Sequence, residues 1–282
     1  MFLKDYKYFL RLCCRNIQAI FSCGRLKMYW FDGRPNLGDG FNKFAIEKIS
    51  NRKVKWVFPK LYPLKHYLVC GSIIENASNN STIWGAGCLY ETTRIPESSN
   101  VYAVRGQHTF SKLTRAQKLQ CIGIGDPGIL ISKLVKNTMQ KVKKAKYGIV
   151  LHYADKDFYS AEDFSHLGSF IFINIETEDI DTFVSQLNSV EVIISSSLHG
   201  LIFADSYLIP SFWMSSKPDR VKGGTYKFED YFSSINANNR KPVSLSEIIS
   251  STPFDPRTKS AEIEKSQNSL IESCPFKCST LS

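Results

Sequence analysis

Two histidines follow apolar segments of the sequence, at points where predicted strands end. His199 lies in SSSLHG, after the segment VEVII, and His152 closes the segment YGIVLH. An imidazole titrates near neutral pH, so it can donate a proton to a substrate, accept one, or hold an anion. Three residues before His199 could offer N–H groups to an anion at a helix start: Ser195, Ser196 and Ser197. We predict His199 as a general acid and His152 as a candidate base, although a single histidine is more often structural than catalytic.

The glycine-rich segment NLGDG, residues 36–40, lies between a predicted strand and a predicted helix. Glycine lets the backbone approach a ligand closely, and the N–H groups that begin a helix favour an anion. Asn36 and Gly38 are therefore predicted to contact an anionic donor. Asp39 has two open roles, as the N-cap of the helix or as a base that removes a hydroxyl proton.

Three further segments carry glycine or basic residues near strand ends. Gly85 and Gly87, in WGAG, leave room for an acceptor to touch main chain. Arg105, in VRGQHT, emerges directly after an apolar strand, where a guanidinium can bind a carboxylate or phosphate through two hydrogen bonds. The alternative for Arg105 is an ordinary surface arginine. Lys222 and Lys227, in VKGGTYKFEDYF, are predicted to lie in a flexible basic loop that closes over a phosphate, with a surface hairpin as the alternative.

Two aspartate motifs are interpreted as structural. The segment DKD, residues 155–157, has the spacing of the metal-binding DxD of nucleotide-sugar enzymes, but the lysine between its carboxylates favours a helix cap or a solvated turn. GDPGIL, residues 125–130, is typical of a turn that opens a short helix. The eight cysteines form no CxxC pair and have no adjacent histidine to complete a zinc set, so we predict free thiols and no required metal or cofactor.

Composition limits the classes of protein and partner. A chain of 282 residues with 43% hydrophobic content can bury a sizeable core, and its length suits two domains. The net charge of +10 favours anionic partners, but the charge is dispersed and no nucleic-acid module is present, so nucleic-acid binding is disfavoured. Residues 1–27 form a basic amphipathic segment that either lies on an anionic membrane face or packs on the body as an ordinary helix. Its recurring charges exclude a secretory signal, and we expect a cytoplasmic protein with peripheral contact at the inner membrane face as an option.

Apolar segments that end in Gly, Asn or Ser and then pass into helical periodicity recur along the chain. This pattern predicts an α/β fold built from βα units with parallel sheets. The predicted strands lie at 26–31, 67–70, 82–84, 101–104, 118–122, 147–151, 170–174 and 190–194, and the clearest later helices at 179–187 and 260–273. The expected organisation is an N-terminal Rossmann-like domain (28–135), a basic linker (136–146), a C-terminal Rossmann-like domain (147–235) and a tail (236–282) whose helix straps back across the domains.

Taken in order, seven motifs resemble the bacterial polysaccharide pyruvyl transferases, in particular their exopolysaccharide ketal-pyruvate branch: NLGDG, WGAG, VRGQHT, GDPGIL, LHYAD, SSSLHGLIFADSYLIP and GGTYKFEDYF. Each motif is short, and their shared order from about residue 28 to residue 235 makes the resemblance specific. The resemblance implies two Rossmann-like domains facing a cleft, as in GT-B glycosyltransferases, with phosphoenolpyruvate as donor. It also implies a sugar acceptor, carried on a polyprenyl lipid, that receives a pyruvate ketal across two hydroxyls.

One position departs from the family pattern. Many members carry Arg-Leu-His after the last strand, and this chain has Ser-Leu-His, with Ser197 in place of the arginine. The donor anion therefore falls to Arg105, Lys222 and Lys227. Two other functions stay open, a GT-B-type glycosyltransferase, including a sialyltransferase-like enzyme, with a nucleotide-sugar donor, and a non-enzymatic component of a polysaccharide assembly complex.

Overall fold

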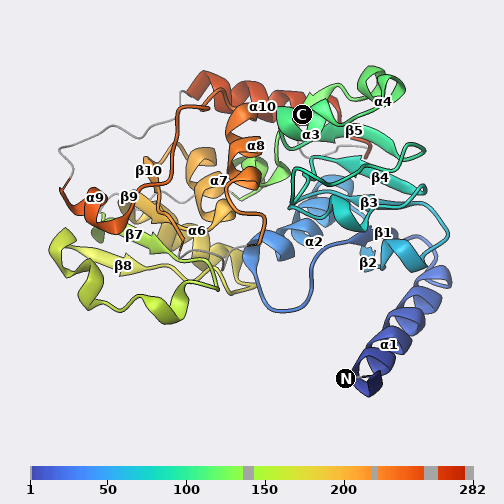
Figure 1. The fold of residues 1–282 in the computed structure, drawn as a ribbon, viewed down its shortest axis with the longest axis horizontal. Helices are drawn as coiled ribbons and strands as arrows, with labels where there is room; N and C mark the ends of the chain where they lie inside the picture. The colour runs from blue at the N-terminus through green and yellow to red at the C-terminus, as the bar shows by residue number, and fades with distance from the viewer. Residues whose placement is uncertain (1, 136–142, 217–221, 251–259, 277–282) are drawn as a thin grey trace.

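The computed structural model describes residues 2–135, 143–216, 222–250 and 260–276. These residues form an α/β fold around two parallel sheets, which lie in the two halves of the molecule (Figure 1). The predicted α/β class is thereby confirmed, and the sheets are consistent with two Rossmann-like domains. Within the predicted linker, residues 136–142 lie outside the described residues, and the second sheet already begins at Ala145.

The first sheet has six strands in the order β2-β1-β3-β4-β5-β6. The strands are β1 (Leu26–Tyr29), β2 (Val54–Trp56), β3 (His66–Leu68), β4 (Ser81–Trp84), β5 (Asn100–Val104) and β6 (Gly123–Ile124). The helices of this half are α2 (Leu37–Ser50), α3 (Gln107–Ser111), α4 (Arg115–Gln120) and α5 (Ile131–Leu134). Helix α2 buries Phe41, Ala45 and Ile49, which recur at the spacing of one helical face, and it ends at Asn51 in the left-handed conformation.

The second sheet has four strands in the order β10-β9-β7-β8. The strands are β7 (Ala145–Val150), β8 (Phe170–Phe172), β9 (Val190–Ser195) and β10 (Ser211–Trp213), and the helices are α6 (Ile180–Asn188), α7 (Leu198–Ser206), α8 (Tyr226–Ser234) and α9 (Leu245–Ser250). The three strands predicted in this half and the helix predicted at 179–187 are confirmed to within a few residues. Strands β7 and β9 pair at the centre because their apolar side chains are covered on both faces.

The strand predicted at 118–122 is wrong. Helix α4 occupies most of this segment because Thr114 and Gln117 form a capping box, in which each side chain accepts the main-chain N–H of the other residue. The edge strand β6 follows the helix instead. Alternating apolar residues in a short segment therefore predicted the wrong element where a cap decided the local structure.

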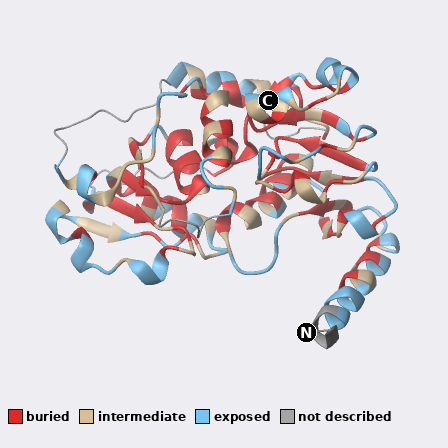
Figure 2. Cartoon of the chain, in the orientation of Figure 1, coloured by how far each residue is buried: buried red, intermediate tan, exposed pale blue. Residues whose placement is uncertain are grey.

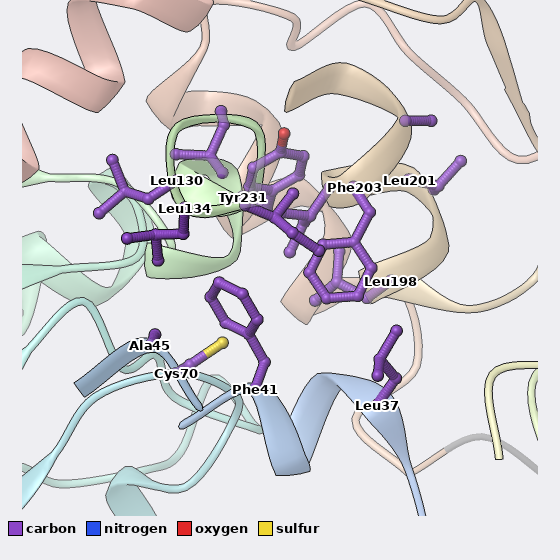
Figure 3. Packing of buried hydrophobic residues seen from close by; sticks show 14 of the residues in the cluster. Leu37, Phe41, Ala45, Cys70, Leu130, Leu134, Leu198, Leu201, Phe203 and Tyr231 are labelled. Carbon is purple, nitrogen blue, oxygen red and sulfur yellow. The ribbon is translucent and has the colours of Figure 1, made fainter. Parts of the chain in front are cut away.

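One hydrophobic core runs through both halves. Figure 3 shows Leu37 and Phe41 of α2 on one side of this core and Leu198 and Phe203 of α7 on the other. The rings of Phe41 and Phe203 pack with their centroids 5.6 Å apart. This contact holds the first turns of α2 and α7, which come from different sheets, close to each other.

The predicted C-terminal helix is present as α10 (Ser260–Glu272) and packs on the first half (Figure 1). Trp84 Nε1 donates to the main-chain oxygen of Leu270 at 3.1 Å, and Gln267 Nε2 donates to that of Ile129 at 2.8 Å. Because α9 lies beside the second sheet, the C-terminal part of the chain runs from the second half back to the first.

Helix α1 (Phe2–Ile20) extends away from the body of the molecule (Figure 1). It is attached through a narrow strip that contains the buried residues Leu12, Asn16 and Ala19. Within the described ranges, no helix has both the length and the apolar character that crossing a membrane requires.

Candidate active site

The candidate active site lies where the carboxyl ends of strands from both sheets come together. The strand order reverses between β1 and β3 in the first sheet and between β7 and β9 in the second. Ligands of open α/β sheets bind outside the carboxyl ends of strands at such reversals. The segments that follow these four strands carry Asp39, Cys70, His152 and His199. The two halves meet here, since His199 Nε2 lies 3.2 Å from Cys70 Sγ.

Asp39 lies in the first turn of α2 and does not cap the helix. The N-cap is Asn36, whose side-chain oxygen accepts the N–H of Gly38 at 2.9 Å, so the N-cap role predicted for Asp39 is wrong. Burial raises the pKa of Asp39 to about 7, while Lys227 opposes the rise and Asp126 adds to it. The Asp39 carboxyl therefore exchanges a proton near neutral pH, as a general acid or base must.

His199 lies in the first turn of α7, between the two halves. A Cβ atom at Gly38 would lie 2.1 Å from Nδ1 of the imidazole, so glycine at this position lets the ring approach the start of α2. Burial lowers the pKa of His199; Asp126 opposes this, and Lys227 and Arg105 add to it. Burial therefore disfavours the protonated form of the predicted general acid, and an anionic ligand beside Lys227 and Arg105 would offset the part of the lowering that these two charges contribute.

Cys70 and Asp126 belong to the same cluster, although the sequence analysis gave neither a role in catalysis. The Cys70 thiol donates to Asp126 Oδ1 at 3.0 Å. The same oxygen accepts the N–H of Gly128, which confirms the predicted turn, while Asp126 Oδ2 is buried without a hydrogen bond to described residues. The sequence contained a signal for Cys70, because this residue follows the apolar segment YLV and precedes a glycine. In the structure that glycine, Gly71, has a φ of +102°.

Among the described residues, Cys70, Asp126 and His199 could together hold a metal ion, since one ligand atom from each lies within 4.8 Å of the others. Burial, with Asp126 adding to it, raises the pKa of the Cys70 thiol well above its usual value, whereas a metal requires the thiolate. The DKD motif was predicted to be a helix cap or a solvated turn. Asp157 is exposed, but Asp155 is buried, so the prediction of a solvated turn is wrong for Asp155. The absence of a required metal stays a prediction, and metal analysis of the purified protein tests it.

Lys227 lies in α8 and is buried, so the flexible basic loop and the surface hairpin are both wrong at this position. Lys222 is exposed in the turn that precedes the helix. Burial lowers the pKa of Lys227 to about 8; Arg105 adds to this, and Asp39 and Asp155 oppose it. The positive charge of this ammonium also lowers the pKa of His152 and of His199, so Lys227 belongs to the same cluster.

Arg105 is fully buried and forms an ion pair with Asp230 of α8. Its Nε and Nη2 both lie 2.9 Å from Asp230 Oδ2, and the other terminal nitrogen donates to the hydroxyl of Ser72 at 2.5 Å. The guanidinium therefore joins the end of β5 to the helix that carries Lys227. Direct binding of a donor by Arg105 stays a prediction, while its positive charge lowers the pKa of both His199 and Lys227.

The two glycines assigned to the acceptor make room for side chains of the protein itself. A Cβ at Gly87 would lie 2.2 Å from Arg105 Cζ. Gly85 has a φ of +91°, and a Cβ there would lie 2.2 Å from Pro127 Cδ. These close approaches account for glycine at both positions, and acceptor contact stays a prediction.

His152 is buried next to the cluster. Its Nδ1 accepts the N–H of Ala154 at 3.2 Å, which places the proton of the neutral ring on Nε2. Burial lowers the pKa of His152 to about 3, and Lys227 and Arg34 add to the lowering. In this tautomer Nε2 carries the proton and can only donate a hydrogen bond. Asp39 is therefore better suited than His152 to remove a hydroxyl proton.

The serines before His199 shape the turn between β9 and α7. Ser195 Oγ donates to the Val150 carbonyl and accepts the N–H of Ser197, and Ser196 Oγ accepts the N–H of His152. Ser197 is the N-cap of α7, without a side-chain hydrogen bond to the helix. Ser195 and Ser196 thus hold the two histidine-bearing segments together, and contact of the three serines with a donor stays a prediction.

Comparisons with known proteins show the family of the chain. The family model described as polysaccharide pyruvyl transferase matches residues 4–218, which include Asp39, Cys70, Asp126 and His199. The chain is 32% identical to Uncharacterized protein L143 of Acanthamoeba polyphaga mimivirus over 212 residues. The aligned region covers 73% of this chain and 73% of the relative. It is 22% identical over 227 residues to the Succinoglycan biosynthesis protein ExoV of Rhizobium meliloti (strain 1021), covering 77% of this chain and 67% of the relative. The chain belongs to the polysaccharide pyruvyl transferase family.

Proposed function

We propose that this protein transfers the pyruvyl group of phosphoenolpyruvate to two hydroxyls of a sugar, forming a pyruvate ketal and releasing phosphate. The acceptor in this proposal is a polyprenyl-linked oligosaccharide of a surface glycan, met on the cytoplasmic side of a membrane, and the reaction needs no metal. The two halves face the substrates across a cleft, as in a GT-B fold. The observation that carries the proposal is the convergence of Asp39, His199 and Lys227 at the strand reversals of both sheets.

The electrostatics of the cluster suit a donor with two anionic ends. Lys227 and Arg105 lower the pKa of His199. A phosphate or carboxylate beside Lys227 offsets that positive charge, so donor binding raises the pKa of His199 and favours its protonated form. The proton that the general acid must supply is then held more tightly when the donor is present.

The reaction requires a proton at the methylene carbon of the donor. His199 supplies this proton, and the neighbouring carbon acquires cationic character, which the bridging oxygen of the phosphate ester stabilises. A sugar hydroxyl adds to that carbon, the C–O bond to phosphate breaks, and a second hydroxyl closes the ketal. Two hydroxyl protons are released, one of them through Asp39 to solvent, and together they balance the proton that His199 gave to carbon and the proton that the leaving phosphate takes up.

Asp39 is the group that receives the hydroxyl proton. Its pKa of about 7 lets it accept a proton at neutral pH and return it to solvent. His152, with Nδ1 already accepting a hydrogen bond, donates from Nε2 to an oxygen of the donor or acceptor. Lys227 provides the positive charge beside the leaving phosphate.

Phosphate release and product mass test the proposal together. The purified protein is incubated with phosphoenolpyruvate and a lipid-linked oligosaccharide extract, each alone and combined, and the glycans are analysed by mass spectrometry. We expect phosphate release and a pyruvyl increment on one sugar only when both substrates are present. Thermal shift by a nucleotide sugar and none by phosphoenolpyruvate would support the glycosyltransferase instead, and no substrate-dependent product would support the assembly component.

The pH dependence of turnover reports on Asp39. We expect turnover to rise as the pH increases through about 7, because the carboxyl must be deprotonated to accept a proton. Asp39→Asn should remove this rise and lower turnover roughly a hundredfold. A pH profile that keeps the same rise in the Asn variant would exclude the base role.

The free energy of unfolding should depend on pH in the opposite sense to turnover, because it falls as the pH rises through about 7. The pKa of Asp39 is raised from 3.8 to about 7 on folding, so the native state holds the proton more tightly than the unfolded state. The resulting stabilisation is complete below about 3.8 and is lost as the pH rises through 7. Urea unfolding at pH 8 should therefore show that Asp39→Asn is more stable than the wild type.

The close approach of Gly38 to His199 gives a matched pair of variants. We expect Gly38→Ala to lower turnover roughly a hundredfold, because the new methyl group overlaps the imidazole and displaces it. Gly40→Ala lies in the same helix and its Cβ would meet nothing within 4 Å, so this control should keep near-normal turnover. Equal activity of the two variants would show that the position of His199 is not critical.

A further inference from the structure

Helix α1 presents an apolar face that the body does not cover. Successive residues of a helix turn by about 100°, which places a group of apolar side chains within a face about 120° wide. The exposed members of this apolar face are Tyr6, Phe9, Leu10, Ile17 and Ile20, and Phe21, directly after the last residue of the helix, extends it. Their exposed fractions reach 79% at Phe21 and 61% at Tyr6, values that are unusual for so many large apolar residues on one helix.

The body contacts a different side of the helix. The buried residues of α1 are Leu12, Asn16 and Ala19. Asn16 exchanges two hydrogen bonds with the main chain of Phe58, and Ala19 packs in a small cluster with Val57 and Tyr62. Figure 2 shows this contrast, with mainly exposed colouring along α1 and only a few buried residues. The contacts fix the orientation of the helix and leave its apolar face turned outward.

Basic side chains adjoin the apolar face on its other side. Lys7 and Arg11 are exposed there, about 100° and 140° around the helix from Tyr6. Residues 1–27 contain six Lys or Arg residues and one acidic residue, Asp5. A second copy of this segment would bring the same excess of positive charge together, with one aspartate for every six basic residues, whereas anionic lipid headgroups would complement the charge.

We propose that α1 is a membrane-docking helix, which lies in the plane of an anionic lipid surface. In that position the apolar face enters the boundary between headgroups and acyl chains, and Lys7 and Arg11 contact the headgroups. Asn16 and Ala19 keep the helix attached to the first sheet, so the body is held at the surface in a defined orientation. This inference does not depend on the reaction.

Vesicle sedimentation of the full chain tests the docking. We expect the protein to co-sediment with vesicles of phosphatidylcholine containing about a third phosphatidylserine, and much less with phosphatidylcholine alone. Ile17→Glu with Phe21→Glu should reduce partitioning by roughly tenfold or more, because two apolar side chains are lost from the lipid contact. Lys7→Glu with Arg11→Glu should reduce binding only to the anionic vesicles and make it less sensitive to salt.

The control carries the same chemical change on another exposed apolar residue. Leu119→Glu replaces a side chain that is 80% exposed on α4, so it should leave vesicle binding unchanged. Circular dichroism and thermal unfolding check that each variant is folded. Failure of the wild type to bind anionic vesicles, or equal binding by the Ile17→Glu/Phe21→Glu variant, would overturn the proposal. Dimerisation in solution that this variant abolishes, without vesicle binding by the wild type, would assign the face to a second copy instead.

Discussion

Replacing His199 with alanine is expected to lower turnover by roughly two to four powers of ten. The imidazole is the group between the halves that is placed to carry a proton to the donor; its Nε2 lies 3.2 Å from Cys70 Sγ, and the negative charge of Asp126 opposes the lowering of its pKa by burial. His199→Gln keeps a polar side chain there but cannot transfer a proton at neutral pH, so its loss should be similar. Initial rates of acceptor-dependent phosphate release measure both variants.

A second control separates chemistry from folding. The native protein and the His199 variants should have similar cooperative unfolding curves, because the imidazole is partly exposed and makes few hydrogen bonds. Near-normal turnover in a folded His199→Ala protein would remove the general-acid role. In that case Asp39, whose pKa of about 7 also permits proton donation, would be the remaining acid within the cluster.

Arg105→Ala is expected to reduce the free energy of unfolding by about 3–5 kcal/mol. The variant leaves the Asp230 carboxylate buried without its cationic partner. Among the described residues, the N–H and the hydroxyl of Thr109 still donate hydrogen bonds to this carboxylate. Chemical denaturation followed by tryptophan fluorescence gives the change directly. Arg115→Ala, an exposed position on α4, is the matched control and should change stability by less than about 0.5 kcal/mol.

The same experiment distinguishes two roles for Arg105. If the guanidinium chiefly anchors α8, the double variant Arg105→Met/Asp230→Leu should be more stable than Arg105→Ala, because no unpaired charge stays buried. If Arg105 binds the donor, a folded Arg105 variant should show a raised KM for phosphoenolpyruvate and nearly unchanged stability. The second outcome would contradict the anchoring role that the ion pair assigns.

Much of the fold was predictable because local patterns decide it. The segments that became β1, β7 and β9 are largely apolar, with β-branched residues in β7 and β9, and each is followed by glycine, serine or a polar loop, so their strand ends could be found from the sequence. The same pattern located Asp39, His152 and His199. Helix α4 was missed because the capping box of Thr114 and Gln117 outweighed a short apolar alternation.

What lay beyond the sequence was the pairing of residues far apart in the chain. Cys70 and His199 are separated by 129 positions, and Arg105 and Asp230 by 125, yet each pair is in contact. Such contacts depend on how the two halves pack, through Phe41 and Phe203, and no local spacing encodes them. The burial of Lys227 follows from the same packing, which turned a predicted surface loop into part of the cluster.

The sequence by itself determined the parallel α/β class, the strand-end loops that form the candidate site and the family to which the chain belongs, because hydrophobic periodicity and short motifs are local properties. Only the tertiary structure decided which groups are ionised and which are structural. Burial and neighbouring charges bring the pKa of Asp39 to about 7 and that of Lys227 to about 8, and they commit Arg105 to Asp230. Those effects arise from distances between side chains and from their exclusion from water, and both exist only after the halves have packed.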